Sequence, residues 1–453
     1  MLRFIGLDIG TTTISAVAID GENGKILKAI TVDNDSAINS ENKARRMQDP
    51  LKIKEKVFML RDALVKEFAP ITAIGVTGQM HGILYLDKYG VPVSPLYTWQ
   101  DASGSLPYEG GTYASVLSEK SGYALASGYG LVTDFVNRDQ GDVPENAVTL
   151  CTVHDYISMS LAGKKAPLVH TSDAASLGCF SLKDGCFDKA ATDALKIDYG
   201  FLPKTTADTA ICGNDCNGIP VAVAIGDNQA SVLGSIKGDD CLLINIGTGS
   251  QVSLITKSPQ PFSDGEVRPL TNDSYMLVGA PLCGGRSFAL LHSFFKECAK
   301  LFGGDADNIY PVMDALALED PDNHSLKVDT RFCGTRKDPS VTGGISGITD
   351  TNFTPAELTR GFLYGMADEL YTLYSSMLAV TDAPAKSIAG SGNAIRKSPV
   401  LRAYLEEMFG LPLNIPAHRE EAAFGAALFA SVASGSYKTL AEAEEKLVHY
   451  TER

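Results

Sequence analysis

Short apolar stretches that end at glycine-containing turns recur along the chain. Residues 4–20 read FIGLDIGTTTISAVAID, and residues 242–256 read LLINIGTGSQVSLIT. In each stretch an apolar run leads into a Gly-Thr turn and an alternating run leaves it, which predicts a strand, a turn and a second strand. Because the two stretches lie about half a chain apart, the pattern favours one α/β domain that occurs twice.

The two Gly-Thr turns align residue for residue. Placing Gly10 on Gly247 sets Thr11 against Thr248 and Asp8 against Asn245. Turns of this kind expose consecutive backbone N–H groups that suit a phosphate, although a single copy also fits a plain hairpin turn. The duplication favours nucleotide phosphates held between the halves, and only the first turn has a carboxylate that suits a hydrated Mg²⁺.

A third stretch, residues 221–235 (VAVAIGDNQASVLGS), predicts a buried strand, a Gly-Asp turn and the start of a helix. Asp227 stands where the strand becomes the helix, and Gly226 allows a ligand to approach the backbone closely. A carboxylate at this position can accept a proton from a hydroxyl substrate. The alternative is that Asp227 caps the helix, since Asp is a favoured N-cap residue.

The rest of the pattern alternates helices with short strands. Helical spacing of apolar residues covers 53–68, a long helix is predicted over 355–380, and a helix of small residues over 420–430. Residues 387–393 (SIAGSGN) predict a strand, a Gly-Ser-Gly turn and a helix. The expected fold class is α/β, with two duplicated domains over 1–235 and 236–453 and a cleft between them.

Polar side chains gather in three segments next to predicted strands and helices. TGQMHG at residues 77–82 follows a short buried strand, and its glycines favour a loop that directs side chains into a cleft. TWQD at 98–101 holds the only tryptophan, which either stacks on a sugar ring or packs in the core with polar neighbours at the surface. TVHDY at 152–156 adds a third cluster, in which His154 lacks a metal partner at ligand spacing and is interpreted as a hydrogen-bonding residue.

Composition narrows the classes of partner. The 453 residues include 39 Lys+Arg against 54 Asp+Glu, a formal net charge of −15, whereas a nucleic-acid surface needs a basic face. We expect no membrane-spanning helix, because no uncharged apolar segment is long enough, and no signal peptide, because Asp8 interrupts the first apolar run. The nine cysteines are scattered, and Cys212-x-x-x-Cys216 has no matching second pair. We therefore expect reduced thiols in a cytoplasmic protein, without a zinc site.

Together these motifs resemble those of the FGGY carbohydrate kinases, a family of the actin-like ATPase superfamily. The similarity covers about the whole chain and rests on DIGTTT at 8–13, TGQMHG at 77–82, GDNQAS at 226–231, NIGTGS at 245–250, AGSGN at 389–393 and EEAAFGAAL at 420–428. It implies two duplicated actin-like, ribonuclease-H-like ATPase domains that transfer the γ-phosphoryl group of ATP, with Mg²⁺, to a sugar hydroxyl. Within the family, TWQD, VHDY, GQMHG and GDNQAS are most similar to sedoheptulokinases, whereas Asn228 and the Gly247-Thr248-Gly249 turn are closer to xylulokinases.

The resemblance also implies roles for individual residues. Asp227 matches the catalytic base, and Asp8 matches the carboxylate that positions Mg²⁺ through water, with Asp227 beside the same ion. The residues implied at the sugar side of the cleft are Gln79, Met80, His81, Trp99, Asp101, Asp155 and Asn228. The residues implied to hold the nucleotide are Thr11, Thr12, Thr13, Gly247, Thr248, Gly249, Gly284, Gly285, Gly390, Ser391 and Asn393.

Chaperone ATPases and filament-forming relatives of actin use the same nucleotide scaffold. They would account for the two phosphate turns and Asp8, but not for residues 79–81, Trp99 and Asp227 directed to one cleft. A sugar sensor without catalysis does not fit the presence of both Asp8 and Asp227. We therefore expect an ATP-dependent ketose kinase whose partners are a small sugar and ATP, with homodimer formation left open.

Overall fold

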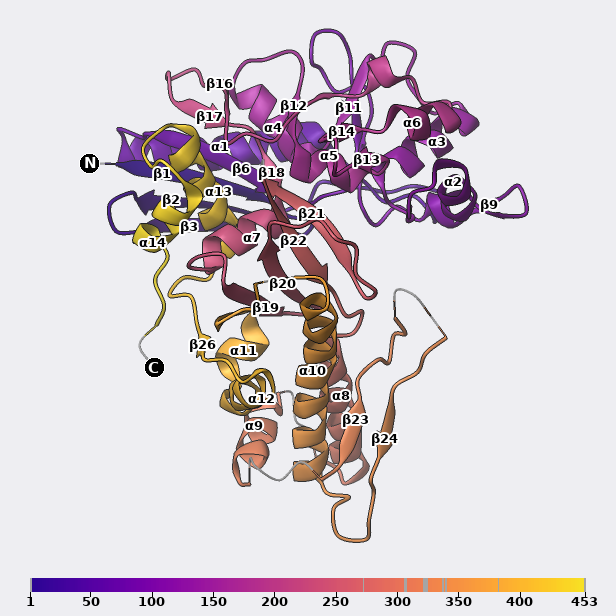
Figure 1. Cartoon of the computed structure of the whole chain (residues 1–453), viewed down its shortest axis with the longest axis vertical. Helices are drawn as coiled ribbons and strands as arrows, with labels where there is room; N and C mark the ends of the chain where they lie inside the picture. Colours follow the sequence, from indigo (N-terminus) through magenta and orange to yellow (C-terminus); the bar gives the residue numbers. More distant parts are fainter. Residues whose placement is uncertain are drawn as a thin grey trace. The chain divides into compact units, whose positions relative to one another are not determined.

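The computed structural model describes residues 2–451 except 272, 305–307, 321–324, 336–337, 339 and 382. The chain divides into two compact units (Figure 1). The first comprises Met1–Ser235, Arg268–Ser274 and Glu420–Val448, and the second Ile236–Val267, Tyr275–Arg419 and His449–Arg453. The sequence ranges 1–235 and 236–453 stay predictions for the two domains, but residues 420–448 pack with the first unit, contrary to what these ranges imply.

A seven-stranded mixed sheet forms the centre of the first unit. Its order is β16-β17-β6-β1-β2-β3, with β18 also paired to β6. The strands are β1 (Arg3–Ile9), β2 (Thr13–Asp20), β3 (Ile26–Asp33), β6 (Ala73–Gly78), β16 (Ile211–Asn214), β17 (Pro220–Ala222) and β18 (Ile225–Gly226). Both β1 and β18 pair parallel with β6, so that Asp8 and Ile225 each lie opposite Thr77. The carboxyl ends of β1, β6 and β18 therefore meet at one edge of the sheet.

Helices and short paired strands complete the first unit. The helices are α1 (Pro50–Phe68), α2 (Tyr113–Ser121), α3 (Gly130–Gln140), α4 (Val153–Leu161), α5 (Thr171–Leu177), α6 (Lys189–Ala194), α7 (Asp227–Ser235), α13 (Glu421–Ala433) and α14 (Leu440–Leu447). The short strands are β4 (Ala37–Ile38), β5 (Met47–Gln48) and β8 (Leu96–Tyr97) in one sheet, and the pairs β7 (Leu84–Leu86) with β11 (Thr149–Cys151), β9 (Pro107–Tyr108) with β10 (Gly111–Thr112), β12 (Leu168–His170) with β15 (Lys204–Thr206), and β13 (Phe180–Ser181) with β14 (Cys186–Phe187).

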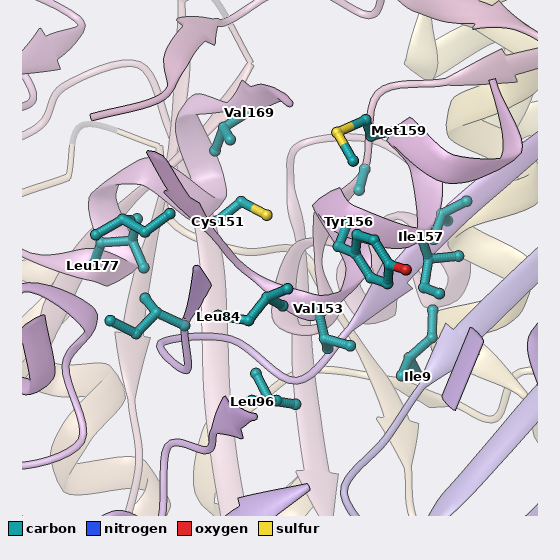
Figure 2. Close-up of a cluster of buried hydrophobic side chains, with 14 of the residues drawn as sticks. Ile9, Leu84, Leu96, Cys151, Val153, Tyr156, Ile157, Met159, Val169 and Leu177 are labelled. Carbon is teal, nitrogen blue, oxygen red and sulfur yellow. The ribbon is translucent and has the colours of Figure 1, made fainter. Parts of the chain in front are cut away.

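The core of this unit follows the predicted apolar pattern. Helix α1 begins after Asp49, whose side chain accepts hydrogen bonds from two backbone N–H groups of the first turn. Its buried residues Ile53, Val57, Leu60 and Leu64 recur at helical spacing, as expected for 53–68. Figure 2 shows another part of the same core, where buried side chains of α4, β7, β8 and β11 gather beside the end of β1.

Small residues allow helix α13 to lie directly on the sheet of the first unit (Figure 1), against β1, β6 and β2. A Cβ atom on Gly6 in β1 would lie 1.7 Å from the carbonyl oxygen of Ala423, and one on Gly425 would lie 1.7 Å from the carbonyl oxygen of Ala230 in α7. These backbones are too close for any side chain between them. This packing explains why residues 420–448 belong with the first unit although they are distant in sequence.

A second sheet has the order β21-β22-β20-β19-β25-β26. Its strands are β19 (Cys241–Ile246), β20 (Ser250–Thr256), β21 (Glu266–Thr271), β22 (Ser274–Gly279), β25 (Ser387–Ser391) and β26 (Leu413–Asn414). Strand β19 pairs antiparallel with β20 and parallel with β25, just as β1 pairs antiparallel with β2 and parallel with β6. The shared topology confirms that the α/β pattern occurs twice.

The second unit carries the longest helix of the described chain. Its helices are α8 (Gly285–Leu301), α9 (Tyr310–Leu318), α10 (Pro355–Leu378), α11 (Asn393–Lys397) and α12 (Pro399–Phe409). Helix α10, predicted over 355–380, packs beside the β23 (Lys327–Asp329) and β24 (Gly344–Ser346) hairpin, as Figure 1 shows. Within the described residues, no helix combines the length and apolar character needed to cross a lipid bilayer.

Candidate active site

Asp8 and Asp227 both lie at the carboxyl edge of the first sheet. Asp8 is the penultimate residue of β1, and Asp227 is the first residue of α7, directly after β18. A carboxylate in the first turn of a helix is stabilised by the unpaired N–H groups there. Asn228 donates from its side-chain amide to Asp227 Oδ1 at 2.8 Å, which fixes one oxygen and leaves the other to a ligand.

The two carboxylates are electrostatically coupled. Burial, followed by the negative charges of Asp227 and Glu420, raises the pKa of Asp8 from 3.8 to about 7, although His154 acts in the opposite direction. Neighbouring carboxylates form a set of oxygen donors suited to Mg²⁺, because a divalent cation relieves the repulsion that raises the pKa of Asp8. The donor set at this edge therefore fits the ion that the sequence predicts.

A hydrogen-bonded network joins the first Gly-Thr turn to Trp99. The indole N–H of Trp99 donates to Thr11 Oγ1 at 2.9 Å, and Thr11 Oγ1 donates to Gln79 Oε1 at 3.2 Å. Gln48 completes the network by donating to Thr11 O at 2.8 Å and accepting from Gln79 Nε2 at 2.7 Å. Trp99 is 47% exposed. The prediction that Trp99 packs in the core was therefore wrong, and stacking of its ring on a sugar stays a prediction.

The other two residues of the 79–81 segment differ in exposure. Met80 is buried, and a Cβ on Gly226 would lie 2.6 Å from its sulfur, so Met80 packs directly beneath the Gly-Asp turn. His81 is half-buried at a positive φ of 70°. Its Nδ1 lies 2.7 Å from Ser176 O, and its ring stacks on Tyr129 with centroids 4.7 Å apart. These contacts fix the imidazole orientation.

Asp101 forms hydrogen bonds that hold the loop carrying Trp99. Its side chain is buried, and its oxygens accept hydrogen bonds from the backbone N–H groups of Arg46 and Ser103 at 3.2 and 3.0 Å. The guanidinium of Arg45 lies 3.7 Å away. Direct contact between Asp101 and a sugar stays a prediction, and these contacts favour a role in holding the loop in place.

His154, Asp155 and Asp173 form a fully buried cluster whose nearest ligand-type atoms lie within 4.8 Å of one another. His154 Nε2 is 2.9 Å from Asp173 Oδ1. No residue at ligand spacing in the sequence accompanies His154, but α5 brings Asp173 beside it, and the interpretation of His154 as a hydrogen-bonding residue stays a prediction. These residues could hold a cation.

The protonation of the cluster reduces its need for a metal ion. Burial lowers the pKa of His154, but the neighbouring carboxylates of Asp173, Asp155 and Asp227 outweigh this effect and raise it to about 9. Burial and Asp173 raise the pKa of Asp155 to about 8. At neutral pH His154 therefore carries a positive charge and Asp155 holds a proton, so that the cluster contains a positive charge of its own.

In the second unit, the predicted phosphate turn packs against a second glycine loop. Gly247 N donates to Gly249 O at 2.9 Å, and Thr248 and Gly249 are exposed. A Cβ on Gly285 would lie 2.0 Å from Gly247 O, and one on Gly284 would lie 2.5 Å from Gly249 C. The predicted nucleotide residues of these two loops therefore come together within this unit.

In the Gly-Ser-Gly segment, Gly390 and Ser391 form the end of β25, and Gly392 alone separates this strand from α11. Ser391 is buried and accepts a hydrogen bond from Asn245 Nδ2 at 2.7 Å, while Gly390 packs beside Ile395. Asn393 is exposed at the start of α11. The pair formed by Asn245 and Ser391 repeats the positions of Asp8 and Thr77 in the first sheet, without the negative charge.

Several residues at the first-unit site were not singled out from the sequence. Gln48 lies in a polar segment without periodicity, and Tyr129 lies in a Gly- and Tyr-rich stretch. Asp173 lies in TSDAAS, which has the composition of a capped loop, and Glu420 begins a motif noted for its small residues. Of these residues, only Glu420 could have been found from the sequence, because it belongs to a motif on which the family resemblance rests, EEAAFGAAL at 420–428.

Comparisons with known proteins agree with this geometry. Two family models match the chain: "FGGY family of carbohydrate kinases, N-terminal domain" over residues 3–234, and the corresponding C-terminal domain over 242–434. Sedoheptulokinase of Homo sapiens is 25% identical over 94% of this chain and 96% of its own length. Glycerol kinase of Aquifex aeolicus is 26% identical over 97% of this chain and 91% of its own. The crystal structure of ligand-bound xylulose kinase from Lactobacillus acidophilus has a TM-score of 0.82 at 20% identity, covering 100% of this chain and 93% of that one. This likeness confirms the predicted α/β fold class.

Proposed function

The chain belongs to the FGGY family of carbohydrate kinases, and from this premise we propose that it transfers the γ-phosphoryl group of ATP to sedoheptulose, giving sedoheptulose 7-phosphate. The observation that supports the proposal most is the pair Asp8 and Asp227 at the shared edge of β1, β6 and β18. Parallel α/β sheets bind ligands at the carboxyl ends of their strands. An edge with two coupled carboxylates suits both deprotonation of a hydroxyl and binding of a cation.

Asp227 acts as the general base in this proposal. Phosphoryl transfer passes through a loose transition state, so alignment of the attacking hydroxyl matters more than its full deprotonation. Asn228 holds one oxygen of Asp227, which directs the other toward the hydroxyl. A base of this kind contributes about 10²–10⁴-fold to the rate.

Asp8 and Asp227 would hold Mg²⁺ together with ATP. The raised pKa of Asp8 means that its proton must leave when the cation binds. When bound, the ion supplies positive charge that stabilises the phosphoryl oxygens. The backbone N–H groups of residues 11–13 would contribute to the same stabilisation. Binding of the nucleotide by residues 247–249, 284–285 and 390–393 of the second unit stays a prediction.

The sugar would be recognised by residues of the first unit. Trp99 presents an exposed ring whose orientation Thr11 fixes, which suits the C–H face of a sugar. His81 and Gln79 supply polar groups held by Ser176 and Gln48. Met80, Asp101 and Asp155 are buried, and they would act by shaping this surface.

The second candidate substrate is xylulose. Asn228 supports it, because this residue contacts the proposed base directly and is the feature of the GDNQAS motif closest to xylulokinases. Sedoheptulose has a longer carbon chain than xylulose. A site whose polar groups bind the hydroxyl groups of the longer ketose should therefore discriminate strongly between the two sugars.

The test is ADP release with Mg·ATP across sedoheptulose, xylulose, ribulose, gluconate, glycerol and a control without sugar. We expect the highest kcat/KM with sedoheptulose. A higher value with xylulose or another sugar would reject the proposed substrate but retain the kinase.

A further inference from the structure

Two cysteine thiols of the second unit face each other beside the glycine loops. Cys333 Sγ lies 3.8 Å from Cys283 Sγ. Cys283 is buried at the end of the segment that follows β22, and half-buried Cys333 lies in a turn closed by a hydrogen bond from Gly334 N to Arg331 O at 3.0 Å. A disulfide needs a sulfur–sulfur distance of about 2.05 Å, so the two atoms must approach by about 1.8 Å.

Cys283 is joined directly to the predicted phosphate turn. The next residue, Gly284, has a φ of 47° and lies against Gly249, where a Cβ would meet backbone at 2.5 Å. Arg286 N donates to Thr248 O at 3.0 Å. Because the two loops touch through backbone atoms, a displacement of Cys283 must move the phosphate turn as well.

A small oxidant can approach from a neighbouring cavity of about 780 Å³. Leu282, next to Cys283, and Gly334, next to Cys333, both line it. Burial and the adjacent Cys333 raise the pKa of Cys283 to about 11, so Cys283 remains a thiol and Cys333 is the sulfur that an oxidant meets first.

We propose that Cys283 and Cys333 form a modification site, in which a peroxide converts the two thiols to a disulfide that weakens ATP binding. Hydrogen peroxide oxidises Cys333 to a sulfenic acid and releases one water. The Cys283 sulfur then attacks the Cys333 sulfur, and the second water leaves as the disulfide forms. In total two thiols lose two electrons and two protons, and one peroxide becomes two waters. The effect on ATP rests on the proposed function, whereas the disulfide itself does not.

The experiment treats the full-length reduced protein with hydrogen peroxide. Disulfide formation is measured by the loss of two hydrogen atoms in the intact mass and by a cross-linked peptide containing residues 283 and 333. ATP affinity is measured by calorimetry without sugar, before and after treatment. Cys333→Ser removes one partner, and Cys298→Ser, a half-buried cysteine on α8, is the matched control.

We expect the cross-linked peptide in the wild type and in Cys298→Ser, with the Kd for ATP raised at least about fivefold, the lower end of ordinary coupling between sites. Dithiothreitol should restore the Kd, and Cys333→Ser should show neither effect. Absence of the cross-linked peptide overturns the modification site. A cross-link without a change in Kd, or an equal change in Cys333→Ser, overturns its effect on ATP. A protein that forms the cross-link but phosphorylates no sugar when reduced contradicts the proposed function and leaves the modification site standing.

Discussion

Asp8 and Asp227 stand on opposite sides of β6, at the ends of two strands that both pair parallel with it, and the charge of Asp227 helps to raise the pKa of Asp8 to about 7. Neither carboxylate is close to the other in sequence, and the parallel pairing brings them to one edge. This relationship places a proposed base beside a proposed cation ligand.

Removal of the Asp8 carboxylate should weaken the response to Mg²⁺. We expect Asp8→Asn to raise the Mg²⁺ concentration for half-maximal activity at least about tenfold, since it removes a charged oxygen donor. In the wild type, Mg²⁺ should bind more tightly as the pH rises through about 7, because Asp8 loses its proton over that range. Activity against Mg²⁺ concentration at several pH values measures both effects. Asp33→Asn, at an exposed acid on β3, is the control, and an equal effect there would contradict the assignment of Asp8.

The Thr11 hydroxyl should set the affinity for the sugar through Trp99. Thr11→Val removes the acceptor of the indole N–H and the donor to Gln79. One or two neutral hydrogen bonds, at about 0.5–1.5 kcal/mol each, correspond to an increase of about 2- to 100-fold in the KM for the sugar. Thr11→Ser keeps the hydroxyl and should retain the wild-type KM. If the serine variant loses as much as the valine variant, the hydroxyl network is not what holds Trp99.

The buried cluster should make stability depend on pH. The folded-state pKa of His154, about 9, lies above its ordinary value of 6.5, so its stabilising contribution is complete below 6.5 and is lost as the pH rises through 9. The raised pKa of Asp155, about 8, acts in the same direction, with its contribution lost between 3.8 and 8. We expect the free energy of unfolding in urea to fall by on the order of a few kcal/mol between pH 6.5 and 9. His154→Gln should flatten this dependence, whereas the exposed His449→Gln should not. Equal slopes in all three proteins would contradict the protonated cluster.

The contact between α13 and α7 should tolerate no side chain. Gly425→Ala places a Cβ 1.7 Å from the carbonyl oxygen of Ala230, so we expect the first unit to lose at least ~3 kcal/mol of unfolding free energy or to fail to fold. The control is Gly344→Ala in β24, where a Cβ meets no atom within 4 Å. Urea unfolding of both variants measures the difference. Similar stability for the two would show that α13 can move away from α7.

Local pattern was enough to predict both Gly-Thr turns, the Gly-Asp turn before α7 and the long helix α10. Each of these follows from residues adjacent in the chain, such as Gly226 and Asp227, whose turn chemistry acts over a few positions. The sheet edge at which the parallel strands end could also be predicted, since an apolar strand with polar residues at its end recurs at Asp8 and at Gln79.

Contacts between residues that lie far apart in the sequence could not be predicted from local patterns. The bond from Trp99 to Thr11 spans 88 positions, and Gln48 enters the same network from a segment with no periodic pattern. His154 on α4 meets Asp173 on α5, which follows β12 later in the chain. The small residues of 420–430 indicate a helix that packs closely against another backbone. The sequence does not indicate that this backbone belongs to the first unit.

The measurement that tests the account most directly is sugar-dependent ADP formation with Mg·ATP by the wild type and by Asp227→Asn. The substitution keeps the size of the side chain and removes its basicity. We predict that the wild type forms ADP only when a sugar is present, and that the variant folds normally and turns over at least about 10²-fold more slowly. An Asn variant with near-wild-type turnover, or equal ADP formation without any sugar, would contradict the proposal.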